Sequence, residues 1–333
     1  MRFPWSQTTA VARYIKRMKK AGANKFPLVM QLEPLHACNL TCSSCGRIRE
    51  YKDRLSDMLS LADCFKAIDE CGAPVVSICG GEPLLYPEIK ALVEGTIQRG
   101  RVVYICTNGQ VLAQKLSLFK PHKMFNINVH IDGLAATHDA IVEKQGAFDK
   151  AISGVVAAKK AGFTVCTNTT LYRQTDVEEI KALFDFLEGL GVNGMLISPG
   201  FDYSDVADQS QFLTRTAIKE KFAALRETGR GKKVWSTPLF LDFLAGKREY
   251  PCTPWGAVTY NVAGWKAPCY LITDGHYAGF SEFMNKTDWK RYGPGRDARC
   301  ANCMCHCGFE PTVALTATNK IRDALTMAKW TMF

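Results

Sequence analysis

The chain has 333 residues, of which 47% are hydrophobic, and it carries a formal net charge of +10 at pH 7. This composition is that of a globular protein with a substantial core, and it excludes a largely disordered chain. No run approaches the roughly 20 apolar residues that a membrane span needs, and the first twenty residues are too charged for a signal peptide, so we expect a cytoplasmic protein.

The N-terminal segment, residues 1–27, is basic and amphipathic. Apolar residues recur at helical spacing between Trp5 and Lys20, and lysines and arginines occupy the positions between them. The favoured interpretation is a surface helix with solvated lysines. The alternative is a helix that lies on the inner face of the membrane and makes the protein peripheral to it. Net charge alone selects neither a membrane, nor nucleic acid, nor an acidic substrate.

Residues 28–230 alternate short β-rich runs with helical patterns. Helix starts are expected at Ser60 with Asp63, at Pro87 and at Thr175 with Glu178. Helix ends are expected at Gly72, Gly100, Gly162 and Gly191. Six strands are expected, at residues 28–32, 75–79, 102–106, 125–131, 163–170 and 192–198. The alternation predicts an α/β fold, with a parallel sheet that is open or curled into a partial (β/α)6 barrel and has its chemistry at the carboxyl ends of the strands.

Residues 231–333 differ in character. Aromatic residues and cysteines become dense, and glycine and proline interrupt every short run until the last fifteen residues. The pattern predicts a separate, irregular, Cys- and aromatic-rich C-terminal domain that does not continue the barrel and closes over its mouth. Its aromatic side chains either wall an apolar cavity or form the core of this domain.

A CxxxCxxC motif, Cys38, Cys42 and Cys45, follows the first expected strand. In a reducing compartment cysteines are more often thiols or metal ligands than disulfides. Three thiolates leave one iron of a 4Fe–4S cluster open to another ligand, whereas a structural zinc normally takes four protein ligands. The alternative is therefore a zinc loop with a distant fourth ligand.

A second motif, Gly80, Gly81, Glu82 and Pro83, follows the second expected strand. Glycines let the backbone approach a ligand, and a carboxylate accepts charge-assisted hydrogen bonds from an ammonium group. Alone, GGEP is also compatible with a simple turn. One strand after a CxxxCxxC motif, it favours a ligand site.

With these two motifs the chain resembles the radical S-adenosylmethionine (SAM) superfamily from the first to the sixth expected strand. The resemblance implies that Cys38, Cys42 and Cys45 bind a 4Fe–4S cluster whose free iron chelates SAM. It also implies that Gly80, Gly81, Glu82 and Pro83 form the segment that binds the SAM amine. Polar residues at later strand ends are in position to contact ribose, carboxylate or substrate, or are ordinary turn residues: His130, Asp132, Asn168 and Ser198.

Cys106 ends the third expected strand and shares its face with Tyr104, because side chains alternate along a strand. A thiol S–H bond is weaker than an alkyl C–H bond, so we expect Cys106 to give a hydrogen atom to a product radical. The alternative is a small buried core residue, which is our interpretation of Cys64, Cys71, Cys79 and Cys166.

The tail holds a further set of cysteines whose first half is similar to the SPASM or twitch appendage of some radical SAM enzymes. That similarity implies an auxiliary iron–sulfur cluster with four cysteine ligands. The run from Cys300 to Cys307 departs from the SPASM spacing, so a structural zinc and unliganded thiols stay open. The expected ligands are Cys252, Cys269, Cys300 and Cys303.

Nearly the whole chain resembles the radical SAM enzymes of hopanoid biosynthesis, the adenosyl-hopene transferases. Residues 26–38, 45–50, 252–256, 268–271 and 300–311 carry this finer resemblance. It implies transfer of the 5'-deoxyadenosyl group of SAM to the alkene of diploptene, a hopene, to give adenosylhopane. It further implies a lipid substrate, a reductase such as flavodoxin or ferredoxin, and no nucleic acid as partner.

Two other functions are compatible with the sequence. One is a radical SAM maturase of a peptide or another polar substrate, suggested by the SPASM-like tail. The other is a zinc-binding module that uses its basic surface on nucleic acid, against which the GGEP motif argues.

Overall fold

The computed structural model describes residues 5–228 and 232–332. Its nine-stranded sheet has the order β6-β5-β4-β3-β2-β1-β7-β8-β9. The first six strands pair in parallel and match the six expected from the sequence to within two residues at each end. They are β1 (Val29–Leu32), β2 (Val75–Ile78), β3 (Val102–Thr107), β4 (Phe125–His130), β5 (Thr164–Leu171) and β6 (Gly194–Pro199). The expected fold class is confirmed.

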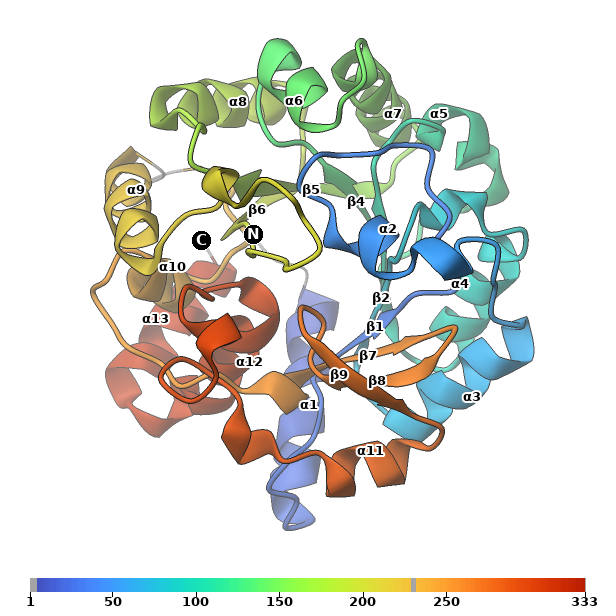
Figure 1. The fold of residues 1–333 in the computed structure, drawn as a ribbon, viewed down its shortest axis with the longest axis vertical. Coiled ribbons are helices and arrows are strands. Elements are labelled where there is room, and N and C mark those ends of the chain that lie inside the picture. Colours follow the sequence, from blue (N-terminus) through green and yellow to red (C-terminus); the bar gives the residue numbers. More distant parts are fainter. Residues whose placement is uncertain (1–4, 229–231, 333) are drawn as a thin grey trace.

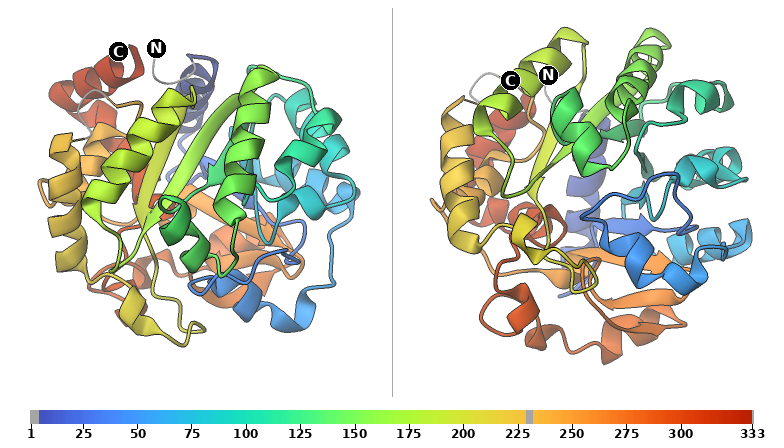
Figure 2. Two further views of the ribbon diagram at one scale, coloured as in Figure 1. Left: turned by 90° about the horizontal axis from the view of Figure 1, so that it is seen from above. Right: turned by 45° about the horizontal axis from the view of Figure 1, so that its top comes forward.

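Helices cover the outer face of this curled sheet, as Figures 1 and 2 show. Between the strands lie α3 (Leu61–Cys71), α4 (Ile89–Gln98), α5 (Leu112–Lys115), α6 (Ala135–Ile141), α7 (Ala147–Lys160) and α8 (Val177–Gly189). The buried core combines aliphatic side chains of the strands with the inner sides of these helices, for example Val103, Ile127 and Leu183.

Most of the expected helix boundaries are confirmed. The Ser60 hydroxyl accepts a hydrogen bond from the Asp63 backbone N–H, as an N-cap does. Each of the four glycines expected at a helix end has a positive φ, the conformation that lets a chain leave a helix. Two starts are wrong, because α8 is capped by Asp176 rather than Thr175, and α4 begins after Glu88 rather than at Pro87.

The tail continues the sheet, so our expectation of a separate irregular domain that does not join the barrel is wrong in this respect. Strand β7 (Ala257–Asn261) pairs in parallel with β1, and β8 (Gly264–Pro268) and β9 (Thr273–Tyr277) follow as an antiparallel hairpin. These runs are too short to be recognised as strands in the sequence, but pairing that starts at the free edge of β1 satisfies their backbone hydrogen bonds. The tail helices are α9 (Arg215–Thr228), α10 (Pro238–Leu244), α11 (Phe280–Lys286), α12 (His306–Thr316) and α13 (Ile321–Met332).

Most of the tail aromatics pack into the buried core that the tail shares with the barrel. Phe240, Phe243 and Trp265 are completely buried, and Trp235 nearly so. The Phe243 ring stacks on Phe309 of α12 with 4.4 Å between the ring centroids. This supports the interpretation of a domain core over that of a cavity wall for these residues.

The N-terminal segment forms helix α1 (Trp5–Lys20), as predicted. Its buried Gln7 donates from Nε2 to Asn126 Oδ1 at 2.9 Å and accepts from the Tyr104 hydroxyl at 2.6 Å. Because Asn126 lies at the start of β4, α1 closes the amino-terminal end of the barrel. Among the described residues, no helix has the length and apolar character to cross a membrane.

Candidate active site

The CxxxCxxC loop follows β1 and ends at the short helix α2 (Gly46–Glu50). Cys38, Cys42 and Cys45 are half-buried in this loop, and none forms a disulfide. Burial raises the pKa of Cys38 to about 11, so a bound metal must displace the thiol proton. A loop with three accessible thiols offers the soft sulfur donors that iron–sulfur clusters take, and it therefore fits the expected cluster.

The GGEP turn holds this loop by direct backbone contact. The N–H of Gly81 donates to the Leu35 carbonyl at 3.0 Å, and the N–H of Glu82 donates to the Ala37 carbonyl at 2.9 Å. A Cβ atom on Gly81 would lie 2.0 Å from the Ala37 carbonyl oxygen, and one on Gly80, whose φ is +103°, would lie 2.4 Å from that of Leu35. Both glycines are therefore required by the cluster loop itself.

The Glu82 carboxylate is buried and holds three protein donors. Oε1 accepts from the Leu84 N–H at 3.0 Å and the Thr107 hydroxyl at 2.8 Å, and Oε2 accepts from the Asn108 N–H at 2.8 Å. One lone pair of Oε2 is left for a ligand. Burial raises the pKa of Glu82 to about 7 against the effect of these hydrogen bonds. Binding of the SAM amine by this segment stays a prediction.

Sequence reasoning missed the role of Asn108. Its Nδ2 lies 3.7 Å from Cys38 Sγ and 2.8 Å from Asn39 Oδ1, so it links the end of β3 to the cluster loop. The position of Asn108 directly after the end of a predicted strand could have indicated this role from the sequence.

Three of the four other strand-end residues meet. His130 Nε2 and Asp132 Oδ2 are 2.6 Å apart, and Asn168 Nδ2 lies 3.5 Å from His130 Nδ1. Although burial opposes it, the Asp132 carboxylate raises the pKa of His130. The fourth, Ser198, accepts instead from the His306 backbone N–H of the tail at 3.4 Å. Their roles toward SAM stay predictions.

Cys106 faces the interior of the barrel on the same side of β3 as Tyr104. Its sulfur lies 3.1 Å from the Ser77 hydroxyl on β2 and 3.6 Å from Asn128 Nδ2 on β4. Burial raises its pKa, so the sulfur keeps its hydrogen. Cys64, Cys71, Cys79 and Cys166 are buried, as expected for core residues.

The tail cysteines gather around one small, mainly apolar cavity. It is lined by all four predicted ligands and by a fifth thiol, that of Cys307, which sequence reasoning missed. Cys305 does not line this cavity; it donates to the Pro199 carbonyl at 3.5 Å and its thiol contacts that of Cys303. Five thiols around one cavity fit an auxiliary iron–sulfur cluster, although no three His, Cys, Asp or Glu side chains in the described ranges are grouped so as to hold a single metal ion.

We expect Cys307→Ala to lower the tail iron, because it removes one of the five sulfur donors that line the cavity, whereas Cys305→Ala, at a thiol outside the lining, should retain it. Iron and sulfide would be measured after anaerobic reconstitution in a chain whose Cys38, Cys42 and Cys45 are already alanine. Equal iron in both variants would contradict a ligand role for Cys307.

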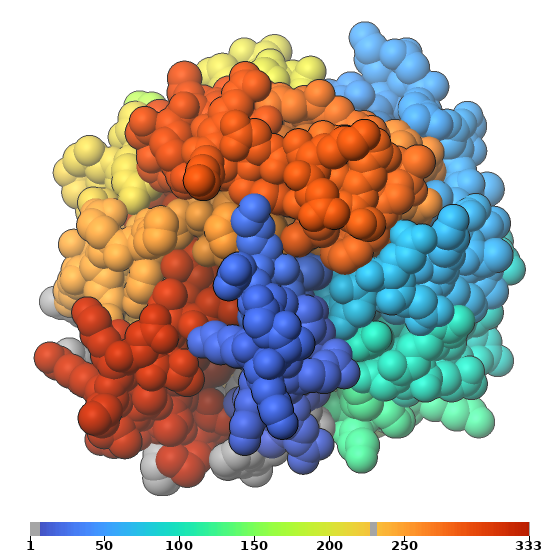
Figure 3. Space-filling model, turned by 90° about the horizontal axis from the view of Figure 1, so that it is seen from below, coloured from blue at the N-terminus to red at the C-terminus, as the bar shows by residue number. Residues whose placement is uncertain are grey.

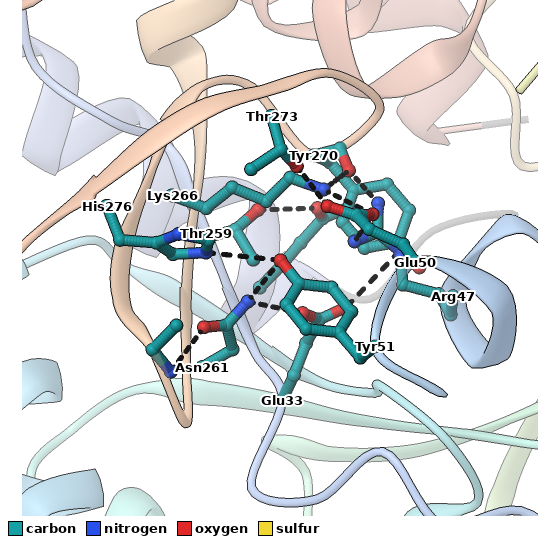
Figure 4. Close-up of polar contacts among 12 residues, drawn as sticks. Glu33, Arg47, Glu50, Tyr51, Thr259, Asn261, Lys266, Tyr270, Thr273 and His276 are labelled. Atoms are coloured by element: carbon teal, nitrogen blue, oxygen red, sulfur yellow. Dashed lines mark hydrogen bonds and ion pairs between the residues drawn. The ribbon is translucent and has the colours of Figure 1, made fainter. Parts of the chain in front are cut away.

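A buried polar network, drawn in Figure 4, ties the tail to the cluster loop. Arg47 Nη1 and Lys266 Nζ each lie 3.0 Å from Glu50 Oε2, and Arg47 Nε lies 3.6 Å from Glu33 Oε1. Arg47 also donates to the Tyr270 carbonyl. Two cations thus balance two carboxylates, and β8 contacts α2 directly.

Aromatic groups extend this network toward the first cluster ligand. The His36 ring stacks on Tyr51 with 3.9 Å between ring centroids. The Tyr51 hydroxyl accepts from Asn261 Nδ2 at 2.9 Å and lies 3.1 Å from His276 Nε2 (Figure 4). The geometry of the cluster loop therefore depends on β7 and β9, which no local pattern in the sequence indicates.

A curled parallel sheet with CxxxCxxC after its first strand and GGEP after its second defines a radical SAM domain. Residues 32–187 match the radical SAM superfamily, to which this domain belongs. Residues 195–327 match a second family, described as a domain of unknown function, DUF3463. The expected cofactors, a 4Fe–4S cluster and SAM, are those of the superfamily.

Two curated relatives match part of this chain. The chain is 29% identical to the AdoMet-dependent heme synthase of Methanosarcina barkeri, over 50% of this chain and 48% of that protein. It is 29% identical to GTP 3',8-cyclase 1 of Mycobacterium tuberculosis, over 53% and 51%. The chain thus spans about half the length of the curated relatives it matches.

Two solved structures share its fold. Streptococcus suis SuiB bound to the precursor peptide SuiA has a TM-score of 0.65 at 14% identity, covering 93% of this chain and 77% of that one. Native anSMEcpe with bound AdoMet has a TM-score of 0.59 at 15% identity, covering 91% and 100%.

Proposed function

We propose that this protein transfers the adenosyl group of SAM to the alkene of diploptene and so forms adenosylhopane. The observation that carries the proposal is spatial. The stretches of sequence that carry the resemblance to the adenosyl-hopene transferases meet in two places. Residues 26–38, 45–50 and 268–271 contribute Glu33, Arg47 and Tyr270 to the buried network. Residues 252–256 and 300–311 contribute to the lining of the tail cavity. The resemblance therefore covers the surroundings of the site and not only its two motifs.

When bound, the cluster supplies the electron that cleaves SAM to a 5'-deoxyadenosyl radical. The residues of this chain then position and protect the reacting groups. The backbone of the GGEP turn fixes the cluster loop, and Glu82 keeps one lone pair for an ammonium group. A reductase such as flavodoxin or ferredoxin, on the cytoplasmic side of the membrane, supplies the electron.

Cys106 completes the proposed reaction. Addition to the alkene forms one C–C bond and leaves an unpaired electron on a tertiary carbon. The Cys106 S–H bond breaks and a C–H bond forms, leaving a thiyl radical that is reduced to the thiol by one electron from the reductase and one proton from water. Because Ser77 and Asn128 hold the sulfur from two sides, the hydrogen reaches one face of the carbon.

The test is anaerobic turnover of the reconstituted protein with SAM, dithionite and diploptene, followed by mass spectrometry. The expected product has the mass of the hopene plus the adenosyl group and one hydrogen. Free 5'-deoxyadenosine that forms regardless of the hopene would refute the hopene substrate and leave the radical SAM domain intact.

We expect Cys106→Ala to cleave SAM and couple it to the hopene, but to give mixed configuration or poorly reduced product. The thiol is the only feature removed, since alanine fits where a half-buried cysteine stood. Cys71→Ala, a change at a core thiol on α3, is the matched control and should leave the configuration unchanged. Unaltered yield and configuration in Cys106→Ala would rule out the hydrogen donor role.

The second candidate is maturation of a peptide. It is favoured by the thiol-lined tail cavity together with the fold shared with SuiB, whose solved complex contains its precursor peptide. Crosslinking of the protein to a peptide, with no turnover of the hopene, would establish it. The zinc-module alternative loses its basis with the match to the radical SAM superfamily.

A further inference from the structure

The last helix of the described chain, α13, presents an apolar face to solvent. Ile321 is 82% exposed, Leu325 57% and Met332 43%, values that contrast with the buried state of most large apolar side chains in this protein. Their spacing of four and seven residues places them along one side of the helix. The polar Asp323 points inward instead, where it accepts two hydrogen bonds from Arg248 at 2.8 and 3.0 Å.

Exposed cations flank this apolar face. Arg322 and Lys329 lie on α13, and Lys320 directly precedes it. The one acidic residue of α13, Asp323, is buried and paired. The face is therefore apolar along its centre and positive at its sides, with no unpaired acid on the helix.

Helix α1 extends the positive surface. It contains no acidic residue, and its exposed side chains include Arg13, Lys16, Arg17, Lys19 and Lys20. The Lys19 ammonium donates to the Leu315 carbonyl at the end of α12, close to where α13 begins. Figure 3 shows α1 in dark blue and the C-terminal segment in red on the same face of the molecule.

We propose that the face formed by α1 and α13 binds the surface of an anionic lipid bilayer. An amphipathic helix with cations beside its apolar side inserts at the boundary of headgroups and acyl chains, and juxtaposed lysines and arginines are attracted by anionic lipids. The charge complementarity selects a bilayer over a second copy of this chain, which would oppose two positive faces. The inference goes beyond the proposed function and holds for any substrate.

The placement of α1 fixes the orientation of the bound protein. Gln7 contacts Asn126 at the start of β4, whereas the cluster loop follows the carboxyl end of β1. The opening of the barrel with Cys38, Cys42 and Cys45 therefore faces away from the bilayer and stays open to a soluble reductase. A lipid substrate would have to leave the bilayer to reach it.

The test is flotation of the full chain with vesicles of phosphatidylcholine alone or mixed with phosphatidylglycerol. We expect binding to the anionic vesicles only, weakened by salt. Lys16→Gln with Lys20→Gln should lower the affinity about five-fold per charge, and Ile321→Ser with Leu325→Ser should lower it about tenfold or more. Val156→Ser, at a 45% exposed position on α7, should change nothing.

Two outcomes would overturn the proposal. The first is equal binding of both vesicle types, or binding of the Ile321→Ser, Leu325→Ser variant at the wild-type level. The second is a dimer in light scattering that the same variant dissociates, which would make α13 an interface between copies. Unchanged iron content in each variant shows that the fold is intact.

Discussion

Replacing Gly81 by alanine is expected to lower the affinity for the 4Fe–4S cluster about tenfold or more, the range seen when the support of a metal ligand is disturbed. The added Cβ would lie 2.0 Å from the Ala37 carbonyl oxygen and 2.5 Å from that of His36. Both are backbone atoms directly before Cys38, so the clash cannot be relieved by a rotamer change. The cluster loop has to shift, and its thiols shift with it.

Iron, sulfide and visible absorbance after anaerobic reconstitution measure this effect. Gly189→Ala on α8 is the matched control, because its Cβ would meet no atom within 4 Å. Wild-type iron in Gly81→Ala, together with wild-type SAM cleavage, would show that the contact between the GGEP turn and the loop does not hold the cluster ligands.

Replacing Arg47 by methionine is expected to lower the free energy of unfolding by about 3–5 kcal/mol, the cost of removing one partner from a buried ion pair. Glu33 is fully buried, and the Glu50 side chain is 16% exposed. Without the guanidinium, Lys266 is the remaining cation for two carboxylates, and it is also the one remaining side-chain donor to the Tyr270 carbonyl, at 2.9 Å. The effect should reach the cluster, since α2 begins directly after Cys45.

Denaturant unfolding followed by circular dichroism measures this loss. Arg54→Met is the control, since Arg54 forms an exposed ion pair with Asp57 that is worth about 1 kcal/mol or less. A loss in Arg47→Met no larger than in Arg54→Met would mean that the network does not fasten the tail to the barrel.

The candidate cluster and SAM-binding residues of the first half of the chain could be predicted from the sequence, because they lie in contiguous motifs. CxxxCxxC and GGEP each keep their ligand groups within a few residues, and each follows a strand whose β-rich run is evident. The helix ends at Gly72 and Gly191 could be predicted for a similar reason, because the left-handed conformation that ends a helix depends on the residue at that position.

Contacts between segments that are distant in the sequence could not be predicted from it. Nothing near Lys266 in the sequence indicates that it lies 3.0 Å from Glu50. Nothing near Cys307 in the sequence indicates that its thiol lines the tail cavity, whereas that of Cys305 donates to the Pro199 carbonyl. Strands β7–β9 were missed because β7 forms by pairing with the edge of β1, and β8 and β9 then add to β7 in turn, which is a tertiary event.

The sequence by itself determined the α/β class, the six parallel strands, the three cluster thiols and the glycine turn, because hydrophobic period and motif spacing are local properties of a chain. Only the tertiary structure decided which thiols share the tail cavity, that the tail completes the sheet, and that α13 turns its apolar side outward. These depend on which surfaces meet when the chain folds, and the pairing of surfaces is set by the free energy of the whole molecule.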